Sequence, residues 1–246
     1  MDEEGRVLAL EMLPYRNLPR QAAVAVMDAA MARAGVTEGH LARCLSTGFG
    51  KKAVHIADAT AHSEFCLQRA LWDIDPAIRT VIDVGGHTVN AFNIDPRGRI
   101  SETAIIDKCV AGTGKFVEIM AKALELPLDV DPALLDGRDP VPMTNQCVIL
   151  AESEVISLVN DGYDRLDIYA GMAASVASRI VGLSKRVAKI EKVAIVGGVA
   201  KNVAVRREVE SKLGVELASL GGIDPQVVGA LGAALLAKDE AEQGQR

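Results

Sequence analysis

The sequence of 246 residues predicts an α/β fold. Short apolar runs rich in Val and Ile, bounded by Gly or Asp, alternate along the chain with amphipathic segments of helical length. Hydrophobic residues make up 49% of the sequence, which is enough to bury a core in one domain or in two lobes around a cleft. We therefore expect strands and helices to alternate, with helices the more numerous.

The expected elements follow from hydrophobic periodicity and from the positions of Gly and Pro. In the first part of the chain they are a strand over 6–13, a helix over 21–34, a strand over 42–47 and a helix over about 61–71. In the second part they are strands over 80–84, 88–94 and 192–196, helices over 116–126, 148–160 and 167–187, a helix ending at 213 and a helix over 227–237. The strands 80–84 and 88–94 flank Gly85-Gly86, which predicts a hairpin.

Charge and composition exclude some classes of function. The net charge is −6, and the chain has only four Phe, three Tyr and one Trp, whereas a nucleic-acid surface needs basic stripes and stacking rings. No apolar run reaches the roughly 18 residues of a membrane span, and the start of the chain, Met1-Asp2-Glu3-Glu4, is acidic, unlike a secretory signal. We expect a cytoplasmic protein that binds neither nucleic acid nor membrane.

The four cysteines, Cys44, Cys66, Cys109 and Cys147, are far apart in the sequence, so in a reducing compartment we expect no structural disulfide. Cys109 and Cys147 each precede a predicted helix, whose dipole favours a thiolate by roughly 0.3–2 kcal/mol. An iron–sulfur cube takes four thiolates, which two such pairs would supply across a two-fold axis. Spacing alone leaves open the alternative that both are small buried residues. We expect Cys44 and Cys66 to pack in the core.

Two glycine turns follow predicted buried strands. In the first, Asp83 lies near the end of a strand and Gly85-Gly86 follow, so that backbone amides can approach a phosphate and the carboxylate can hold a Mg²⁺-bound water. In the second, Gly197-Gly198 stand between a strand and a helix, where an adenosine or a phosphate would rest. Tight strand–helix packing is the alternative explanation for these glycines. The run Gly112-Thr113-Gly114-Lys115 lacks the first glycine and the final Ser or Thr of a Walker loop, which excludes a P-loop.

Taken in order, six segments resemble the activator, or ATPase, family of 2-hydroxyacyl-CoA dehydratases and benzoyl-CoA reductases, the BadF/BadG/BcrA/BcrD type within the actin-like ATPase superfamily. The segments are 46–50, 81–86, 107–116, 147–157, 197–202 and 229–234. The resemblance covers most of the chain and implies a ribonuclease H-like, two-lobed ATPase fold. It places a partial N-terminal lobe at 1–75 with 221–246 and a C-terminal lobe at 76–220.

The resemblance also implies a function. A homodimer would hold one [4Fe–4S] cluster between its subunits, and ATP binding and hydrolysis with Mg²⁺ would drive a low-potential electron to a partner iron–sulfur dehydratase or reductase that acts on CoA thioesters. The implied cluster ligands are Cys109 and Cys147, and Asp83 and Glu152 are the candidate catalytic residues. The candidate nucleotide-binding residues are Gly85, Gly86, His87, Gly112, Gly114, Gly197, Gly198 and Asn202.

The sequence departs from the family pattern at its start. The family opens with a phosphate loop of the form Gly-Ile-Asp-x-Gly-Ser-Thr, and nothing like it precedes Arg6. We therefore expect an N-terminal lobe without its first strands, either because Met1 is not the true start or because the protein is shortened. A shortened protein favours the alternative function, a non-hydrolysing dimeric cluster-binding scaffold. A sugar or acetate kinase is disfavoured, because no acceptor-binding Asp segment is present and kinases need no paired cysteines.

Three polar residues near these motifs have weaker assignments. His87-Thr88 replaces the Gln-Asp expected in many relatives, so His87 either meets phosphate or is a solvent-facing turn residue. Glu152 and Glu154 flank Ser153 inside a predicted helix, close to its start, where acids favour the dipole. We expect Glu154 to be structural and Glu152 to face the nucleotide.

Overall fold

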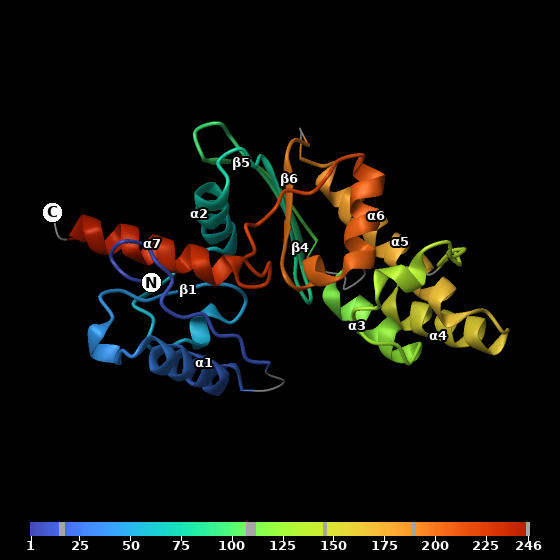
Figure 1. Ribbon diagram of the computed structural model, residues 1–246, viewed down its shortest axis with the longest axis horizontal. Coiled ribbons are helices and arrows are strands. Elements are labelled where there is room, and N and C mark those ends of the chain that lie inside the picture. The colour runs from blue at the N-terminus through green and yellow to red at the C-terminus, as the bar shows by residue number, and fades with distance from the viewer. Residues whose placement is uncertain (15–17, 107–111, 145–146, 188–189, 245–246) are drawn as a thin grey trace. The chain divides into compact units, whose positions relative to one another are not determined.

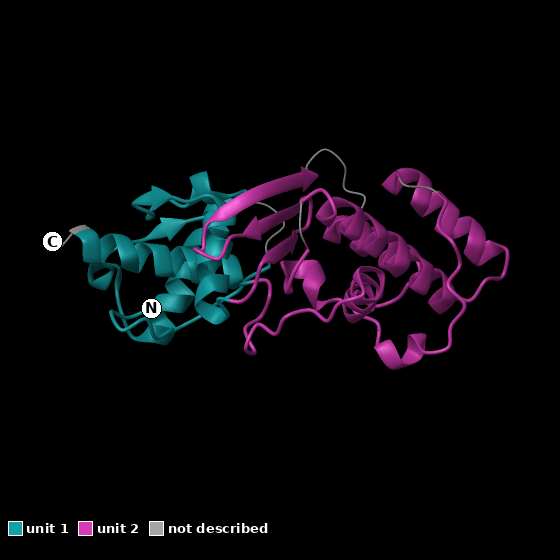
Figure 2. Ribbon diagram, turned by 90° about the horizontal axis from the view of Figure 1, so that it is seen from above, with its two compact units in different colours: residues 1–76, 227–246 teal, residues 77–226 magenta. Residues whose placement is uncertain are grey.

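The computed structural model describes the whole chain except residues 15–17, 107–111, 145–146, 188–189 and 245–246, which Figure 1 draws as a thin grey trace. The described residues divide into two compact units (Figure 2). Unit 1 consists of Met1–Pro76 with Val227–Arg246, and unit 2 consists of Ala77–Gln226.

Unit 1 is mainly helical. Its long helices are α1 (Pro19–Ala34), α2 (Ser63–Ile74) and α7 (Val228–Gly244), and its strands β1 (Leu45–Ser46) and β2 (Ala59–Thr60) form a short parallel pair. Helices α2 and α7 pack closely, because an added Cβ at Gly232 would lie only 1.7 Å from the carbonyl oxygen of Cys66. Cys66 is fully buried as expected, and burial raises the pKa of its thiol, whereas Cys44, also expected in the core, is only half-buried.

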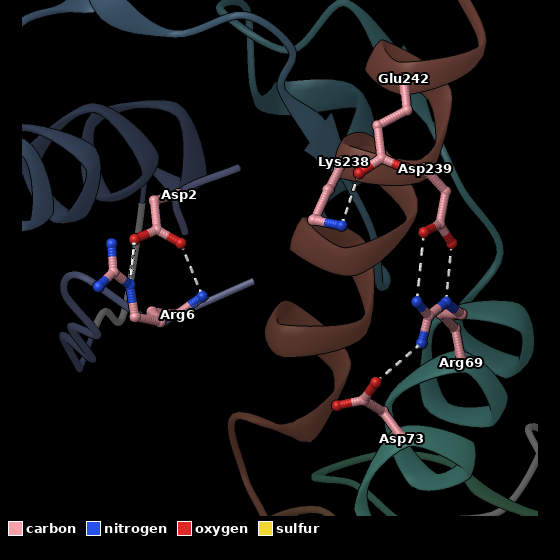
Figure 3. A network of polar contacts seen from close by, with 7 residues as sticks. All are labelled: Asp2, Arg6, Arg69, Asp73, Lys238, Asp239 and Glu242. Atoms are coloured by element: carbon pink, nitrogen blue, oxygen red, sulfur yellow. Dashed lines mark hydrogen bonds and ion pairs between the residues drawn. The ribbon is translucent and has the colours of Figure 1, made fainter. Parts of the chain in front are cut away.

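Ion pairs fasten the same two helices together (Figure 3). The guanidinium of Arg69 on α2 donates to both carboxylate oxygens of Asp239 on α7, at 2.7 and 3.2 Å, and also pairs with Asp73 one turn along α2. The hydrogen bonds to the Asp239 carboxylate raise the pKa of Arg69 above its ordinary value. A two-bond Arg–carboxylate contact fixes both the distance and the rotation of α7 relative to α2.

The strand predicted over 6–13 is wrong, and the strand predicted over 42–47 shrinks to the two residues of β1. Residues 6–14 have no helix or strand assignment, and in this stretch the large apolar side chains Val7, Leu8, Leu10, Met12 and Leu13 are 41–51% exposed. A strand needs a hydrogen-bonded neighbour, and among the described residues none pairs with this segment. Apolar alternation alone does not supply that neighbour.

Unit 2 is built on a four-stranded sheet in the order β5-β4-β3-β6. Strand β4 (Val89–Ile94) is antiparallel to both of its neighbours, β3 (Thr80–Val84) and β5 (Ile100–Ile106), and β6 (Val193–Val196) runs parallel to β3. The hairpin predicted between residues 80 and 94 is confirmed, with Val84 opposite Val89. The parallel β3–β6 pair brings the ends of two strands, each followed by glycines, to the same edge of the sheet.

Four long helices complete unit 2: α3 (Gly114–Ala123), α4 (Val148–Asn160), α5 (Arg165–Ser184) and α6 (Val203–Leu213). Helix α5 lies against β3, β4 and β5 and packs on α6 and α3. By length and composition alone α5 is apolar enough to cross a membrane, but 11 of its 20 residues are buried inside the unit. This is the pattern of a core helix in a folded domain.

Candidate functional site

The first glycine turn is joined by hydrogen bonds to the start of helix α3. Within the turn the N–H of Gly85 donates to the carbonyl of Thr88 at 2.9 Å. The carbonyls of Gly85 and Gly86 accept from the N–H groups of Gly114 and Lys115, both at 2.9 Å. These donors belong to the first turn of a helix, where N–H groups have no partner within the helix. The hairpin turn and α3 therefore form one connected piece of backbone.

Two glycines let these segments approach one another. An added Cβ at Gly114 would lie 3.3 Å from the carbonyl oxygen of Gly85 and 3.3 Å from Cγ2 of Val199. Gly197 has φ +88°, and a Cβ there would lie 2.4 Å from the carbonyl oxygen of Val84. A side chain at Gly197 is thus excluded both by backbone conformation and by contact. The structure brings the two predicted glycine turns and Gly114 together.

The carboxylate of Asp83 lies beside the second glycine turn. Its Oδ1 atom is 2.9 Å from the position that a Cβ of Gly197 would occupy, and the residue is half-buried near the end of β3. In the first turn Gly86 and His87 are exposed. In the second turn Gly198 is also exposed, so the backbone at the ends of β3 and β6 is open to solvent at both turns.

Gly112 places the segment before α3 against helix α5. Its φ is +84°, and an added Cβ would lie 3.1 Å from Cβ of Arg179 on α5. The Arg179 guanidinium stacks over the ring of Phe116, 5.4 Å from its centre, in the first turn of α3. The predicted ligand Cys109 lies just before this segment, outside the described residues.

Asn202 is buried in a network that spans three elements. Its Oδ1 accepts from the N–H of Val205 at 3.0 Å and so caps helix α6. Its Nδ2 donates to the carbonyl of Leu128 at 2.9 Å and to the hydroxyl of Tyr169 at 2.7 Å. The Tyr169 hydroxyl donates in turn to Leu128, and burial raises the pKa of Tyr169. The amide of Asn202 is thus used within the protein, so contacts with a nucleotide at this turn would come from the backbone.

Cys147 is the N-cap residue of helix α4, as predicted, and is exposed. Its carbonyl accepts from the N–H of Ala151 at 2.8 Å, and its side chain makes no capping hydrogen bond. The thiol therefore stands at the positive end of the helix dipole. Among the described residues, no group of three or more His, Cys, Asp or Glu side chains lies together as a metal site.

The two glutamates of α4 differ in what they contact. Glu152 is exposed on the first turns of the helix. Glu154 accepts hydrogen bonds from both the N–H and the hydroxyl of Thr144, three residues before Cys147. This contact agrees with the structural assignment of Glu154. The placement of Glu152 in a nucleotide site stays a prediction.

Several residues around these turns were not singled out from the sequence. Tyr169 and Arg179 lie on α5 and reach the site from elements distant in sequence. Gly171, also on α5, carried a usable signal. A glycine inside an amphipathic helix costs about 1 kcal/mol relative to alanine, so its presence suggests close contact with another segment.

The chain matches known proteins both in sequence and in structure. A family model described as the BadF/BadG/BcrA/BcrD ATPase family matches residues 1–237. The activator of lactoyl-CoA dehydratase from Anaerotignum propionicum is 37% identical over 219 residues, 88% of this chain and 83% of that protein. The crystal structure of component A of the Acidaminococcus fermentans (R)-2-hydroxyglutaryl-CoA dehydratase is similar at a TM-score of 0.87 and 34% identity, covering 98% of this chain and 93% of that one.

A second solved structure is informative about ligands. It is the activator of the 2-hydroxyisocaproyl-CoA dehydratase from Clostridium difficile with bound ADPNP. It matches at a TM-score of 0.82 and 34% identity, covering 90% of this chain and 82% of that one. A protein of this fold and similar sequence therefore binds an ATP analogue.

Proposed function

Since the chain belongs to the BadF/BadG/BcrA/BcrD ATPase family and has the actin-like ATPase fold, we propose that it is an ATP-coupled iron–sulfur activator. It would deliver low-potential electrons to a partner iron–sulfur enzyme of the 2-hydroxyacyl-CoA dehydratase or benzoyl-CoA reductase type. Relatives named as activators of such dehydratases support the partner class. The proposal includes a cytoplasmic homodimer, with one [4Fe–4S] cluster held by Cys109 and Cys147 of each subunit.

One observation carries the proposal. The carbonyls of Gly85 and Gly86 accept hydrogen bonds from Gly114 and Lys115, at the start of the helix that follows Cys109. A phosphate that reorganises the hairpin turn would therefore act on the backbone only a few residues after a proposed cluster ligand. Packed contacts of this kind transmit small shifts because they cannot deform continuously.

The described residues suggest a division of roles at the nucleotide. The backbone amides of the exposed residues Gly86 and His87 would meet phosphate, and Asp83 would hold a Mg²⁺-bound water. Gly198 offers an open surface for the adenosine. After the second turn, the ammonium of Lys201 pairs with Asp224 at 2.7 Å. This hydrogen bond holds the pKa of the Asp224 carboxyl below its usual value.

The one proposed ligand among the described residues, Cys147, has the chemistry of an iron–sulfur donor. Cys147 presents an exposed thiol at a helix N-terminus, and thiolate sulfur is the ligand that such clusters use. When bound, a [4Fe–4S] cluster supplies one-electron transfer at low potential. The chain would contribute this thiol at the N-terminal end of α4, and its exposed position would leave room for the cysteines of a second subunit.

Iron content after anaerobic reconstitution tests the cluster. We expect a brown dimer with about four irons per pair of subunits. Cys147→Ala and Cys109→Ala should each lose the iron and the colour, whereas Cys44→Ala, at a half-buried position, should keep both. A colourless wild-type protein, or iron retained in Cys147→Ala, would refute the assignment.

ATP hydrolysis by the same preparation separates the activator from a non-hydrolysing cluster scaffold. An activator should hydrolyse MgATP, and Asp83→Asn should slow hydrolysis about 100-fold or more by removing the charge that organises the metal-bound water. Arg207→Ala, an exposed change on α6, serves as the control and should hydrolyse at the wild-type rate. Iron binding without any hydrolysis would favour the scaffold.

A further inference from the structure

Residues 138–144, which precede Cys147 in the sequence, contact the two helices α5 and α4. Arg138 pairs with Asp164 at 3.1 Å and with Asp167 at 3.5 Å, at the start of α5. The N–H of Val141 donates to the carbonyl of Asp167 at 3.1 Å. These contacts hold the middle of the segment on the first turn of α5.

Gly171 sets how closely the segment approaches α5. An added Cβ there would lie 1.7 Å from the carbonyl oxygen of Val141, a separation that no side chain permits. The φ angle of Gly171 is not among the positive ones, so the glycine is needed for the contact and not for its backbone conformation. The backbone around Val141 is thereby fixed against the face of a buried helix.

The last anchor is Glu154. Its Oε1 accepts from the N–H of Thr144 at 2.8 Å and from the hydroxyl of the same residue. Hydrogen bonds to a carboxylate are about twice as strong as neutral ones. Thr144 precedes Cys147 by three residues and Glu154 follows it by seven, so the contact joins residues on both sides of the cysteine in the sequence.

We propose that Glu154, acting through Thr144, is the positioning residue for Cys147. The inference rests on the proposed function, in which Cys147 is a cluster ligand. The carbonyl of Cys147 is fixed by the N–H of Ala151, and Thr144, three residues earlier, is fixed by Glu154. Both attachments are to α4, so the thiol keeps its place at the end of that helix. Changes in residues that orient metal ligands lower metal affinity about 10- to 100-fold.

The test uses Glu154→Ala and Thr144→Val, with Thr144→Ser as the conservative variant that keeps the hydroxyl. Asp161→Asn removes the same charge from the far end of α4 and is the control. In the iron-loaded dimer, the rate of iron loss to a chelator should rise about tenfold in the first two variants. It should stay at the wild-type rate in Thr144→Ser and Asp161→Asn. The electron paramagnetic resonance spectrum of the reduced protein should change in Glu154→Ala and Thr144→Val only.

Hydrogen exchange of the apo protein tests the anchor without a cluster. The amide of Thr144 should exchange about tenfold faster or more in Glu154→Ala, since one N–H bond of about 1.4 kcal/mol is lost. Unchanged exchange at Thr144, or unchanged iron loss and spectra in loaded variants, would overturn the inference. Failure of the wild-type protein to take up iron would instead overturn the proposed function, and the exchange measurement would still decide whether Glu154 holds the loop.

Discussion

Replacing Asn202 should destabilise unit 2 even without any nucleotide. In Asn202→Ala, helix α6 loses the side-chain cap on the N–H of Val205, a fully buried residue. Loss of a cap costs about 1 kcal/mol, and leaving buried polar groups without their partner costs about 1–3 kcal/mol. Tyr169 and Leu128 keep the bond between them, so we expect a total of about 3 kcal/mol.

Asn202→Ser separates the two contributions. A serine hydroxyl still caps the helix but is too short to replace the amide that bridges Leu128 and Tyr169. The expected loss is about 1.5 kcal/mol, half that of alanine. Arg207→Ala on the same helix, whose side chain is 55% exposed, should change stability by less than about 0.5 kcal/mol.

The measurement must report on unit 2. The single tryptophan, Trp72, lies on α2 in unit 1, so its fluorescence follows the wrong unit. Hydrogen exchange of peptides from α6, followed by mass spectrometry, gives the opening free energy directly. Wild-type protection in Asn202→Ala would refute the reasoning, because it would mean that the network carries no stability.

Three further predictions concern single residues. Gly197→Ala should cost about 3 kcal/mol or more by circular dichroism melts, since φ is +88° and Val84 is in contact; Gly198→Ala, 3.9 Å from its nearest neighbour, should cost less than about 1. Burial raises the pKa of Tyr169, so this side chain keeps its proton in the folded state at a pH where it ionises in the unfolded chain. The free energy of unfolding should therefore fall above about pH 10, and Tyr169→Phe should remove that part of the fall in urea titrations. Arg69→Lys should cost about 0.5–1 kcal/mol by Trp72 fluorescence, less in about 1 M salt, because lysine cannot make both bonds to Asp239.

Elements with strong local signals were predicted well. Helix α4 begins at Val148 and ends at Asn160 as expected, because an apolar periodic run follows a cysteine at the N-cap and precedes Asp161 and Gly162. Strand β3 also has its predicted bounds, since its buried Val and Ile residues lead directly into the glycine turn. In both cases the sequence near the element determines it.

Elements that depend on a distant partner were not predicted. The segment over 6–13 alternates like a strand but has no hydrogen-bonded neighbour among the described residues. Strand β5, absent from the expected elements, is largely exposed and carries Ser101, Glu102 and Thr103, so it lacks the apolar pattern of a buried strand. Pairing with β4 forms it. The sequence near an edge strand contains little of the information that places it.

Within the candidate site, the sequence indicated the glycines but not the residues that hold the surrounding backbone in place. Gly114 and Gly197 lie where a Cβ would come too close to a neighbouring segment, so glycine is needed there and marks the site in the sequence. The bond between Asn202 and Tyr169 joins residues 33 positions apart, and the contact between Glu154 and Thr144 joins residues ten positions apart across a helix start. No local pattern identifies such pairs before the chain is folded.

The coupling of nucleotide to cluster is the central claim, and one spectrum tests it most directly. The protein is reconstituted with iron and sulfide, reduced, and examined by electron paramagnetic resonance with and without MgATP. The hydrogen bonds from Gly114 and Lys115 to the Gly85-Gly86 turn predict that MgATP changes the spectrum of the reduced protein, and that Asp83→Asn abolishes the change. No signal from the reduced protein, or identical spectra with and without MgATP, would contradict the account.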